Sequence, residues 1–250
     1  MKLLHFTQKH FLLARPATML LLVVWLSACA TQPVTNTNPD DPWEPFNRKV
    51  YAFNRGFDKA IFKPVAKGYD AIMPDAPQRG VRNFFRNWQA PLTFVNQLLQ
   101  GKVDEAFTTV GVFLMNTTLG LGGFFDIGAK AGAPQYKEDF GQTMAVWGWK
   151  KSRYLVVPIL GPYTVRDLGG RGVVSYWGPT SFVIREYNNY VPLIVDLVSI
   201  RAELLPLDKT IEKAPDPYAM VRDAYLQIRE YEIYDGDPPA PDYDALLEEY

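Results

Sequence analysis

The chain has 250 residues, of which 48% are hydrophobic and 14% aromatic, enough apolar material for a real core. A length of this order predicts one or two domains. The formal net charge is −1, with 26 basic and 27 acidic residues. No basic patch with interleaved aromatic residues is present, so a nucleic-acid partner is not expected.

The first 28 residues have the organisation of a lipoprotein signal peptide. Lys2, Lys9 and Arg15 precede an apolar run over residues 17–26. A basic start, a short apolar segment and small residues before a cleavage site are typical of a secretory signal. The apolar run is about half the length that a transmembrane helix needs. An uncleaved N-terminal membrane anchor is the alternative interpretation.

The sequence "LSAC", which ends at Cys29, resembles the bacterial lipobox. Cys29 is the only cysteine, and a polar segment follows it. We therefore expect Cys29 to begin the mature protein and to carry an N-acyl diacylglycerol, with residues 29–41 as a flexible tether. Several acyl chains hold a protein on a bilayer far more firmly than one chain does. Ala30 occupies the position where Asp would signal inner-membrane retention, which indicates the outer membrane of a Gram-negative cell.

Cleavage before Cys29 would exclude several kinds of chemistry. It would remove His5 and His10, the only histidines, and leave 23 basic against 27 acidic residues. Without histidine, neither a Ser-His-Asp nor a Cys-His catalytic group can form. The common zinc sites built from His or Cys are excluded as well. The glycine-rich segments "LGLGGFFDIG" and "GGRGVVS" complete no nucleotide-binding motif, so we expect no metal and no cofactor.

Carboxylate chemistry is the remaining enzymatic alternative, because a glycosidase needs only two acidic residues at a suitable separation. Glu138 with Asp139, or Asp167, are the candidates. No spacing selects a pair among them, and we expect the protein not to be an enzyme.

Helical periodicity dominates the chain from Trp43 onward, which predicts an all-α fold. The first helix is expected to have Asp41 as its N-cap and Pro42 at its first position. Its apolar stripe consists of Phe46, Val50, Phe53 and Phe57. Two further helices are expected on either side of a break before Pro91, with the second ending at Gly101.

A helix over residues 102–116 follows, and then the small, glycine-rich segment 117–133. That segment fits close backbone packing or an apolar surface toward lipid. A tight buried turn is the alternative. One or two helices extend to Leu205, with a kink or break at Pro192. The last helix has Asp216 as N-cap and Pro217 at its first position.

The stretch "RYLVVPIL" is the weakest point of the all-α prediction, because it could form a strand locally. Pro158 would confine such a strand to an edge or a hairpin. We expect a single helical domain over residues 42–235 and an acidic, disordered tail over residues 236–250.

Six motifs in this order connect the chain to a known family: "DPWEPFNRKVYAFN", "NQLLQG", "FLMNTTLGLGGFFDIG", "EDFGQTMAVWGW", "VPILGPYTVRD" and "DPYAMVRDAY". Together they resemble the MlaA (VacJ) family of outer-membrane lipoproteins, over residues 40–235. The resemblance implies a mostly helical, ring-shaped domain embedded in the inner leaflet of the outer membrane and facing the periplasm. It also implies an amphipathic channel beside a mobile hairpin.

The function implied by the resemblance is phospholipid transport without covalent chemistry. Such proteins remove phospholipids misplaced in the outer leaflet and pass them to a periplasmic carrier of the MlaC type, which maintains lipid asymmetry. They are often bound to a trimeric porin of the OmpC/OmpF type. The alternative is a structural, porin-associated envelope lipoprotein that transports no lipid.

Residues 154–167 match the position of the family's hairpin, so the resemblance places the lipid passage there. The expected hairpin residues are Tyr154, Leu155, Val156, Val157, Pro158 and Leu160. Gly161 and Gly169 are the expected flexible points. Arg166 is a candidate headgroup contact, because the forked donors of arginine suit phosphate. A structural ion pair between Arg166 and Asp167 is the alternative.

Overall fold

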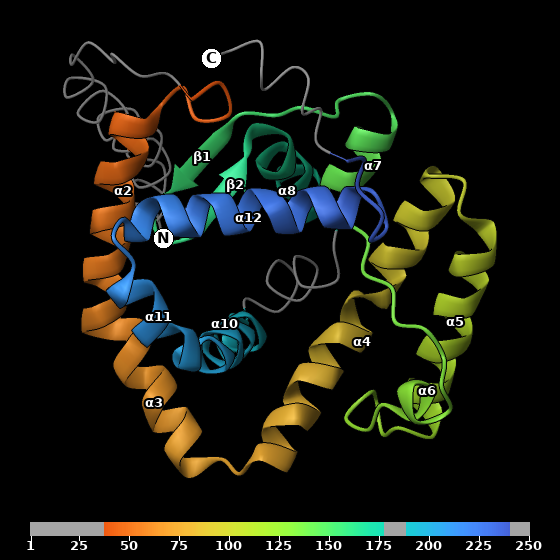
Figure 1. Cartoon of the computed structure of the whole chain (residues 1–250). Helices are drawn as coiled ribbons and strands as arrows, with labels where there is room; N and C mark the ends of the chain where they lie inside the picture. The colour runs from red at the N-terminus through yellow and green to blue at the C-terminus, as the bar shows by residue number, and fades with distance from the viewer. Residues whose placement is uncertain (1–37, 178–188, 241–250) are drawn as a thin grey trace, which may run out of the picture.

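The computed structural model describes residues 38–177 and 189–240 (Figure 1), and helices dominate this part of the chain. The expected signal peptide, Cys29 and the last ten residues of the tail lie outside the described residues. The expected domain limits therefore remain predictions.

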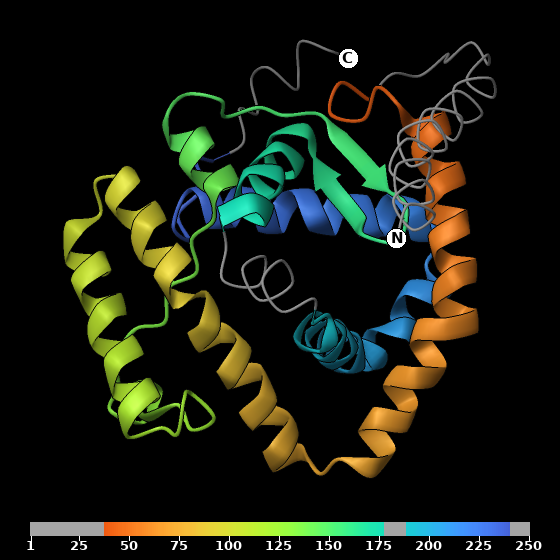
Figure 2. The ribbon, with the colours of Figure 1, turned by 180° about the vertical axis from the view of Figure 1, so that it is seen from behind.

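Helices along the periphery of the protein form a frame that has the outline of a ring in two opposite views (Figures 1 and 2). The first side consists of α2 (Glu44–Phe57), a π-helix η1 (Asp58–Phe62) and α3 (Lys63–Ile72). The other sides are formed by α4 (Asp75–Leu99) and α12 (Pro217–Ile233). Helix α10 (Val191–Glu203) lies within the frame and packs against α3 and α4.

The remaining elements complete the frame or lie outside it. Helix α5 packs along α4 on the outside. A β-hairpin lies beside α2 and α12. These elements are α5 (Val103–Thr118), α6 (Ile127–Lys130), α7 (Phe140–Val146), β1 (Tyr154–Val157), β2 (Gly161–Thr164), α8 (Val165–Trp177), η2 (Leu205–Leu207) and α11 (Asp208–Lys213).

The all-α prediction needs a correction at the hairpin. β1 and β2 pair antiparallel, with Tyr154 opposite Thr164 and Val156 opposite Pro162. The Val156 N–H bonds to a side chain of α2 instead of to β2. Because this position makes no ladder bond, the missing N–H of Pro162 costs nothing here.

The predicted start of the first helix is wrong. Helix α2 begins at Glu44, and the Asp41 side chain caps nothing there. The carboxylate is buried instead, where it accepts hydrogen bonds from Asn47 Nδ2 at 2.7 Å and from the Tyr218 hydroxyl. A contact with a helix 177 residues away therefore overrides the local capping signal.

The predicted break before Pro91 is also wrong, because α4 runs without interruption through that residue. A proline inside a helix costs about 3 kcal/mol. Packing of α4 along α5 and α10 offsets this cost. At Pro192 the outcome is different. This residue lies in the first turn of α10, where its missing N–H removes no helical hydrogen bond.

The glycine-rich segment combines close backbone packing with an exposed apolar surface. A Cβ on Gly120 would lie 2.1 Å from the Phe125 carbonyl oxygen, so the turn is tight. The large side chains of the same segment nevertheless point outward, with Leu119 and Leu121 each about 70% exposed.

Candidate functional site

The long helices bury polar side chains and expose apolar ones. In α4 the buried residues are Gln78, Gly80, Asn87, Thr93, Asn96 and Gln97. Large apolar side chains on the exposed surfaces of α4 and α5 include Val95, Leu98, Leu99, Val103, Phe107 and Leu114. This distribution of polar and apolar side chains is the reverse of that on a helix of a water-soluble protein. Apolar patches of this extent mark contact with membrane or protein.

Hydrogen bonds between helices satisfy many of these buried polar groups. The Thr109 hydroxyl of α5 donates to Gln97 Oε1 at 2.8 Å, and the Thr143 hydroxyl of α7 donates to Asn96 Oδ1 at 2.8 Å. Asn116 bonds both Asp126 and the Gly128 N–H. Within the described residues, no helix is both long and apolar enough to cross a membrane.

Two adjoining cavities run along α4, and we call them together the polar passage. One, of about 360 Å³, lies among α4, α5, α10 and the loop at residues 134–137. The other, of about 400 Å³, lies among α4, α7, β2, α8 and α12. They share Gln89, Thr93 and Lys137 in their walls. Charged residues line both, namely Arg82, Arg86, Lys137, Glu138, Asp139, Asp167, Arg171, Asp196, Glu203, Arg229 and Glu232, with Asp126 at the α5 end.

Asp196 of α10 places a carboxyl group in the wall of this passage. Burial raises the pKa of this carboxyl above its ordinary value, while the positive charge of Arg171 acts in the opposite direction. Arg171 lies in α8, and its guanidinium stands 5.8 Å from the centre of the Tyr163 ring. The passage thus carries charges of both signs on separate helices.

The predicted hairpin residues divide into a buried base and an exposed tip. Tyr154 and Val156 are completely buried or nearly so, in a core with Val50 and Tyr218. Leu155 and Val157 are half-buried on the opposite face. The tip, consisting of Pro158, Ile159 and Leu160, is exposed. Ile159 (φ 68°) and Gly161 (φ 88°) both adopt the left-handed conformation that closes the turn.

Two asparagines of α2, which we call the asparagine clamp, hold this hairpin. Asn47 donates to the Tyr154 carbonyl at 3.3 Å and accepts from the Val156 N–H at 2.9 Å. Asn54 donates to the Val157 carbonyl at 2.9 Å and accepts from the Ile159 N–H at 2.7 Å. The sequence analysis missed both. Their spacing of seven residues, which places them on one helix face, was the available signal.

Arg166 is one of the most buried side chains, with 1% exposure. Its guanidinium donates to Asp167 Oδ1 at 3.1 Å and to the carbonyls of Trp149 and Lys150 at 3.0 and 2.8 Å. This geometry is that of the structural ion pair, with the guanidinium held by the loop that precedes the hairpin. Gly169 lies inside α8 and forms no loop hinge in this conformation.

Arg229 of α12 joins the end of the hairpin region to α7. It donates to both oxygens of Asp167, at 3.0 and 3.1 Å, and to both oxygens of Asp139, at 2.8 and 3.1 Å. Burial acts to raise the pKa of each of these carboxyls. The charge and hydrogen bonds of Arg229 outweigh that effect, so both pKa values lie below the ordinary range.

The three candidate carboxylates are therefore engaged in ion pairs and hydrogen bonds with neighbouring side chains. Glu138 is held by Lys102 at 3.0 Å and by Gln100 at 2.9 Å. Asp139 and Asp167 are ionised partners of Arg229, which leaves neither with a proton to donate as a general acid. Across residues 38–177 and 189–240, no cluster of His, Cys, Asp or Glu is arranged to hold a metal ion.

Comparison with known proteins identifies the family. Residues 39–232, more than three quarters of the chain, match the MlaA lipoprotein family. The chain belongs to the MlaA lipoprotein family. A solved structure of 30% identity, described as the structural basis for maintenance of bacterial outer membrane lipid asymmetry, superimposes with a TM-score of 0.69. The match covers 77% of this chain and 98% of that one.

Related proteins align with most of this chain. The intermembrane phospholipid transport system lipoprotein MlaA of Escherichia coli is 31% identical over 85% of this chain and 86% of its own. Its counterpart in Haemophilus influenzae is 31% identical over 88% and 90%. A protein of Rickettsia felis is 37% identical over 77% and 78%.

Proposed function

We propose that this MlaA-family protein transports phospholipid between the membranes of the cell envelope and thereby maintains the lipid asymmetry of the outer membrane. It removes misplaced phospholipids from the outer leaflet and delivers them on the periplasmic side. The reversed polarity of α4 and α5 is the observation that carries this proposal. A protein with an apolar outside and a polar inside fits a lipid environment around a hydrophilic route.

The ring would lie in the inner leaflet, with the apolar surfaces of α4 and α5 against acyl chains. Exposed tryptophans support this position, because amphipathic rings are favoured at the boundary between headgroups and hydrocarbon. Trp147 and Trp149 are 58% and 46% exposed, and the Trp147 Nε1–H donates to the Leu99 carbonyl at the end of α4. The acylated Cys29 would hold the protein at the same membrane.

A phospholipid that changes leaflet needs a polar path for its headgroup while its acyl chains stay in hydrocarbon. The polar passage supplies charged and hydrogen-bonding groups for the headgroup. The hairpin contributes Pro162 and Tyr163 to one wall of this passage. Movement of the exposed tip, with Gly161 beside it, would then control entry. No covalent step and no nucleotide are required.

A periplasmic carrier of the MlaC type would accept the lipid, and a trimeric porin of the OmpC/OmpF type would hold the ring in the membrane. Both partners follow from the family resemblance. A structural, porin-associated lipoprotein without transport would have the same surfaces, so the passage itself must be tested.

Gln89→Trp tests the passage, because this exposed residue lines both of its cavities. Val95→Trp is the matched control on the outer surface of the same helix. Each variant is expressed in a strain that lacks the gene, and outer-leaflet phospholipid and detergent resistance are measured. We expect Val95→Trp to restore both and Gln89→Trp to restore neither, with equal porin association. Full restoration by Gln89→Trp would favour the structural alternative.

A further inference from the structure

A further cavity lies beneath the hairpin, between α2 with η1 on one side and α11 with α12 on the other. It measures about 370 Å³, within the range of about 300–1,000 Å³ typical of small-molecule sites. We call it the hairpin pocket. Its apolar wall consists of Val156, Pro162, Leu204, Leu207, Ile211 and Val221. Pro162 also lines the polar passage, so β2 forms part of the boundary of both cavities.

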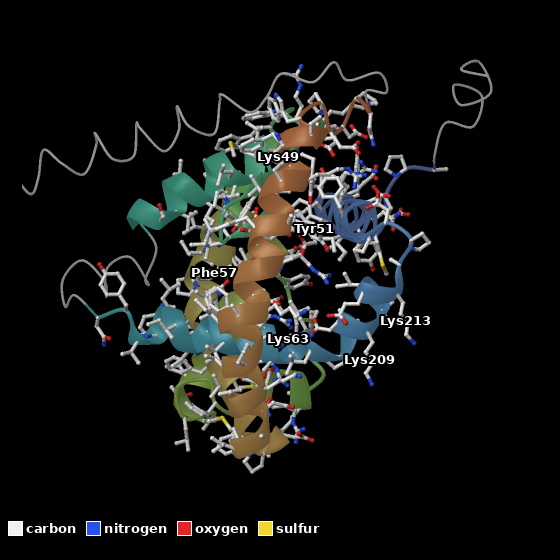
Figure 3. All side chains as sticks on the ribbon, turned by 90° about the vertical axis from the view of Figure 1, so that its left-hand side faces the viewer. Lys49, Tyr51, Phe57, Lys63, Lys209 and Lys213 are labelled. Carbon is white, nitrogen blue, oxygen red and sulfur yellow. The ribbon has the colours of Figure 1, made fainter. Side chains whose placement is uncertain are left out.

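Figure 3 looks onto this side of the molecule. Tyr51 lies between α2 and α12, and Lys63 lies further along the same run of helices. Lys209 and Lys213 point from α11 away from the body of the protein.

Two polar atoms in residues that line this pocket are buried without a hydrogen-bond partner among the described residues. One is the hydroxyl of Tyr154, a residue with no exposed surface. The other is Nη1 of Arg201, whose Nε and Nη2 atoms bind Asp58 at 2.6 and 2.9 Å, with Nη2 also reaching Asp208. Buried polar atoms are rarely left unpaired in native proteins. The unpaired Arg201 donor suits a ligand that carries an oxygen acceptor.

The charges around the pocket restrict the ligand further. Its lining includes four cationic side chains, Arg55, Lys59, Lys63 and Arg201, against three anionic ones, Asp58, Asp208 and Glu212. The anionic groups are engaged in ion pairs with these cations. A small excess of positive charge therefore remains, and it suits a single negative group at the pocket rim.

We propose that the hairpin pocket binds one acyl chain of a single-chain amphiphile, whose carboxylate or phosphate accepts a hydrogen bond from Arg201 and whose chain lies beneath the hairpin against Tyr154. The volume is near the lower end for ligand sites and suits one chain better than two. A free fatty acid and a lysophospholipid share this chemistry. The site is separate from the proposed transport route, because a headgroup could cross the polar passage with this pocket empty.

Photolabelling of the full acylated protein in nanodiscs tests the proposal. Two probes are used, palmitic acid with a diazirine in its chain and a lysophosphatidylglycerol carrying the same chain. After irradiation, mass spectrometry locates the adducts. We expect adducts at pocket residues such as Leu204, Ile211 and Val221 with at least one probe. Labelling by palmitic acid shows that a free chain suffices, and labelling by the lysolipid alone identifies a phospholipid product.

Val221→Trp fills the pocket, whereas Met220→Trp places the same ring next to it on α12 at a residue outside the pocket lining. We expect the first to reduce labelling at Leu204 and Ile211 by about tenfold or more, and the second to leave it unchanged. Leu207→Trp repeats the test from η2 at a half-exposed residue, in case Val221→Trp does not fold.

If adducts fall only on the outer apolar surface, or if both pocket-filling variants label like the native protein, the proposal is overturned. None of these results depends on transport activity, so a failure of the transport proposal would be seen separately.

Discussion

Asn47 has a larger structural role than its polar side chain suggests. It has no exposed surface, and its one amide group bonds the Asp41 carboxylate, the Tyr154 carbonyl and the Val156 N–H. Its neighbours in sequence had indicated only a helix with an apolar stripe. The side chain links the entry of α2 to a strand more than a hundred residues later.

Replacing Asn47 with alanine should therefore destabilise the fold strongly. The change leaves two buried backbone groups of β1 without partners, which costs about 2–3 kcal/mol. Asn54→Ala should cost less, because its site is only partly buried. Chemical denaturation in detergent measures both, with the exposed Lys67→Ala as control. Equal stability of Asn47→Ala and Lys67→Ala would contradict a structural role for the clamp.

Asp216 should give the protein a defined acid sensitivity. A hydrogen bond from Arg48 lowers the pKa of Asp216 from 3.8 to about 2, although burial opposes the shift. Because the folded pKa lies below the unfolded one, this stabilisation is present above about pH 4 and is lost as the pH falls toward 2.

Thermal melting of Asp216→Asn against the native protein measures this effect. Asparagine can still cap α12 but cannot form the ion pair. We expect the variant to be less stable at about pH 6 and the difference to shrink between pH 4 and 2. A difference that stays constant with pH would assign the effect to capping alone. The magnitude should be modest, because the side chain is 42% exposed.

At the scale of elements, the sequence predicts a helix well where its signals are local. The start of α12 is confirmed, since Asp216 accepts from the N–H groups of Tyr218 and Ala219. Pro91 and Asp41 gave wrong predictions because distant packing decides their surroundings. The clamp and the Arg229 ion pairs escaped prediction for the same reason, since their partners lie 62 to 109 residues away in the chain.

The hairpin offers a direct test of whether its movement matters. The Ile159 backbone N–H donates to Asn54 Oδ1 at 2.7 Å, so Asn54→Cys with Ile159→Cys places two thiols near the turn. We expect the oxidised form to lose lipid removal while it keeps porin association, and reduction to restore removal. Asn54→Cys alone is the control. Equal removal by both redox forms would count against gating by the hairpin.

At the scale of the whole molecule, the outer surface should insert into lipid without the acyl anchor. Phe107 and Leu114 are 70% and 54% exposed on α5, where nothing in the described chain covers them. A protein that begins at Ala30, with no lipidated cysteine, should still float with phospholipid vesicles.

Charge on this surface should weaken that association. Phe107→Glu with Leu114→Glu is expected to reduce vesicle binding by more than about tenfold, since each charged side chain in hydrocarbon costs several kcal/mol. Lys213→Glu, at an exposed and already charged position, is the control. Vesicle flotation measures both. Undiminished binding of the double variant would place the lipid-facing surface elsewhere.

The asparagine clamp also limits self-association of the protein through its β-hairpin. A two-stranded sheet leaves an open strand edge, and an open edge invites another chain to pair with it and aggregate. On the outer edge of β1, the Val156 N–H and the carbonyls of Tyr154 and Val157 are taken by Asn47 and Asn54, and the Tyr154 N–H by the Asp40 carbonyl. Helix α2 thus substitutes for a third strand along β1, and these groups are not available to pair with a neighbouring molecule.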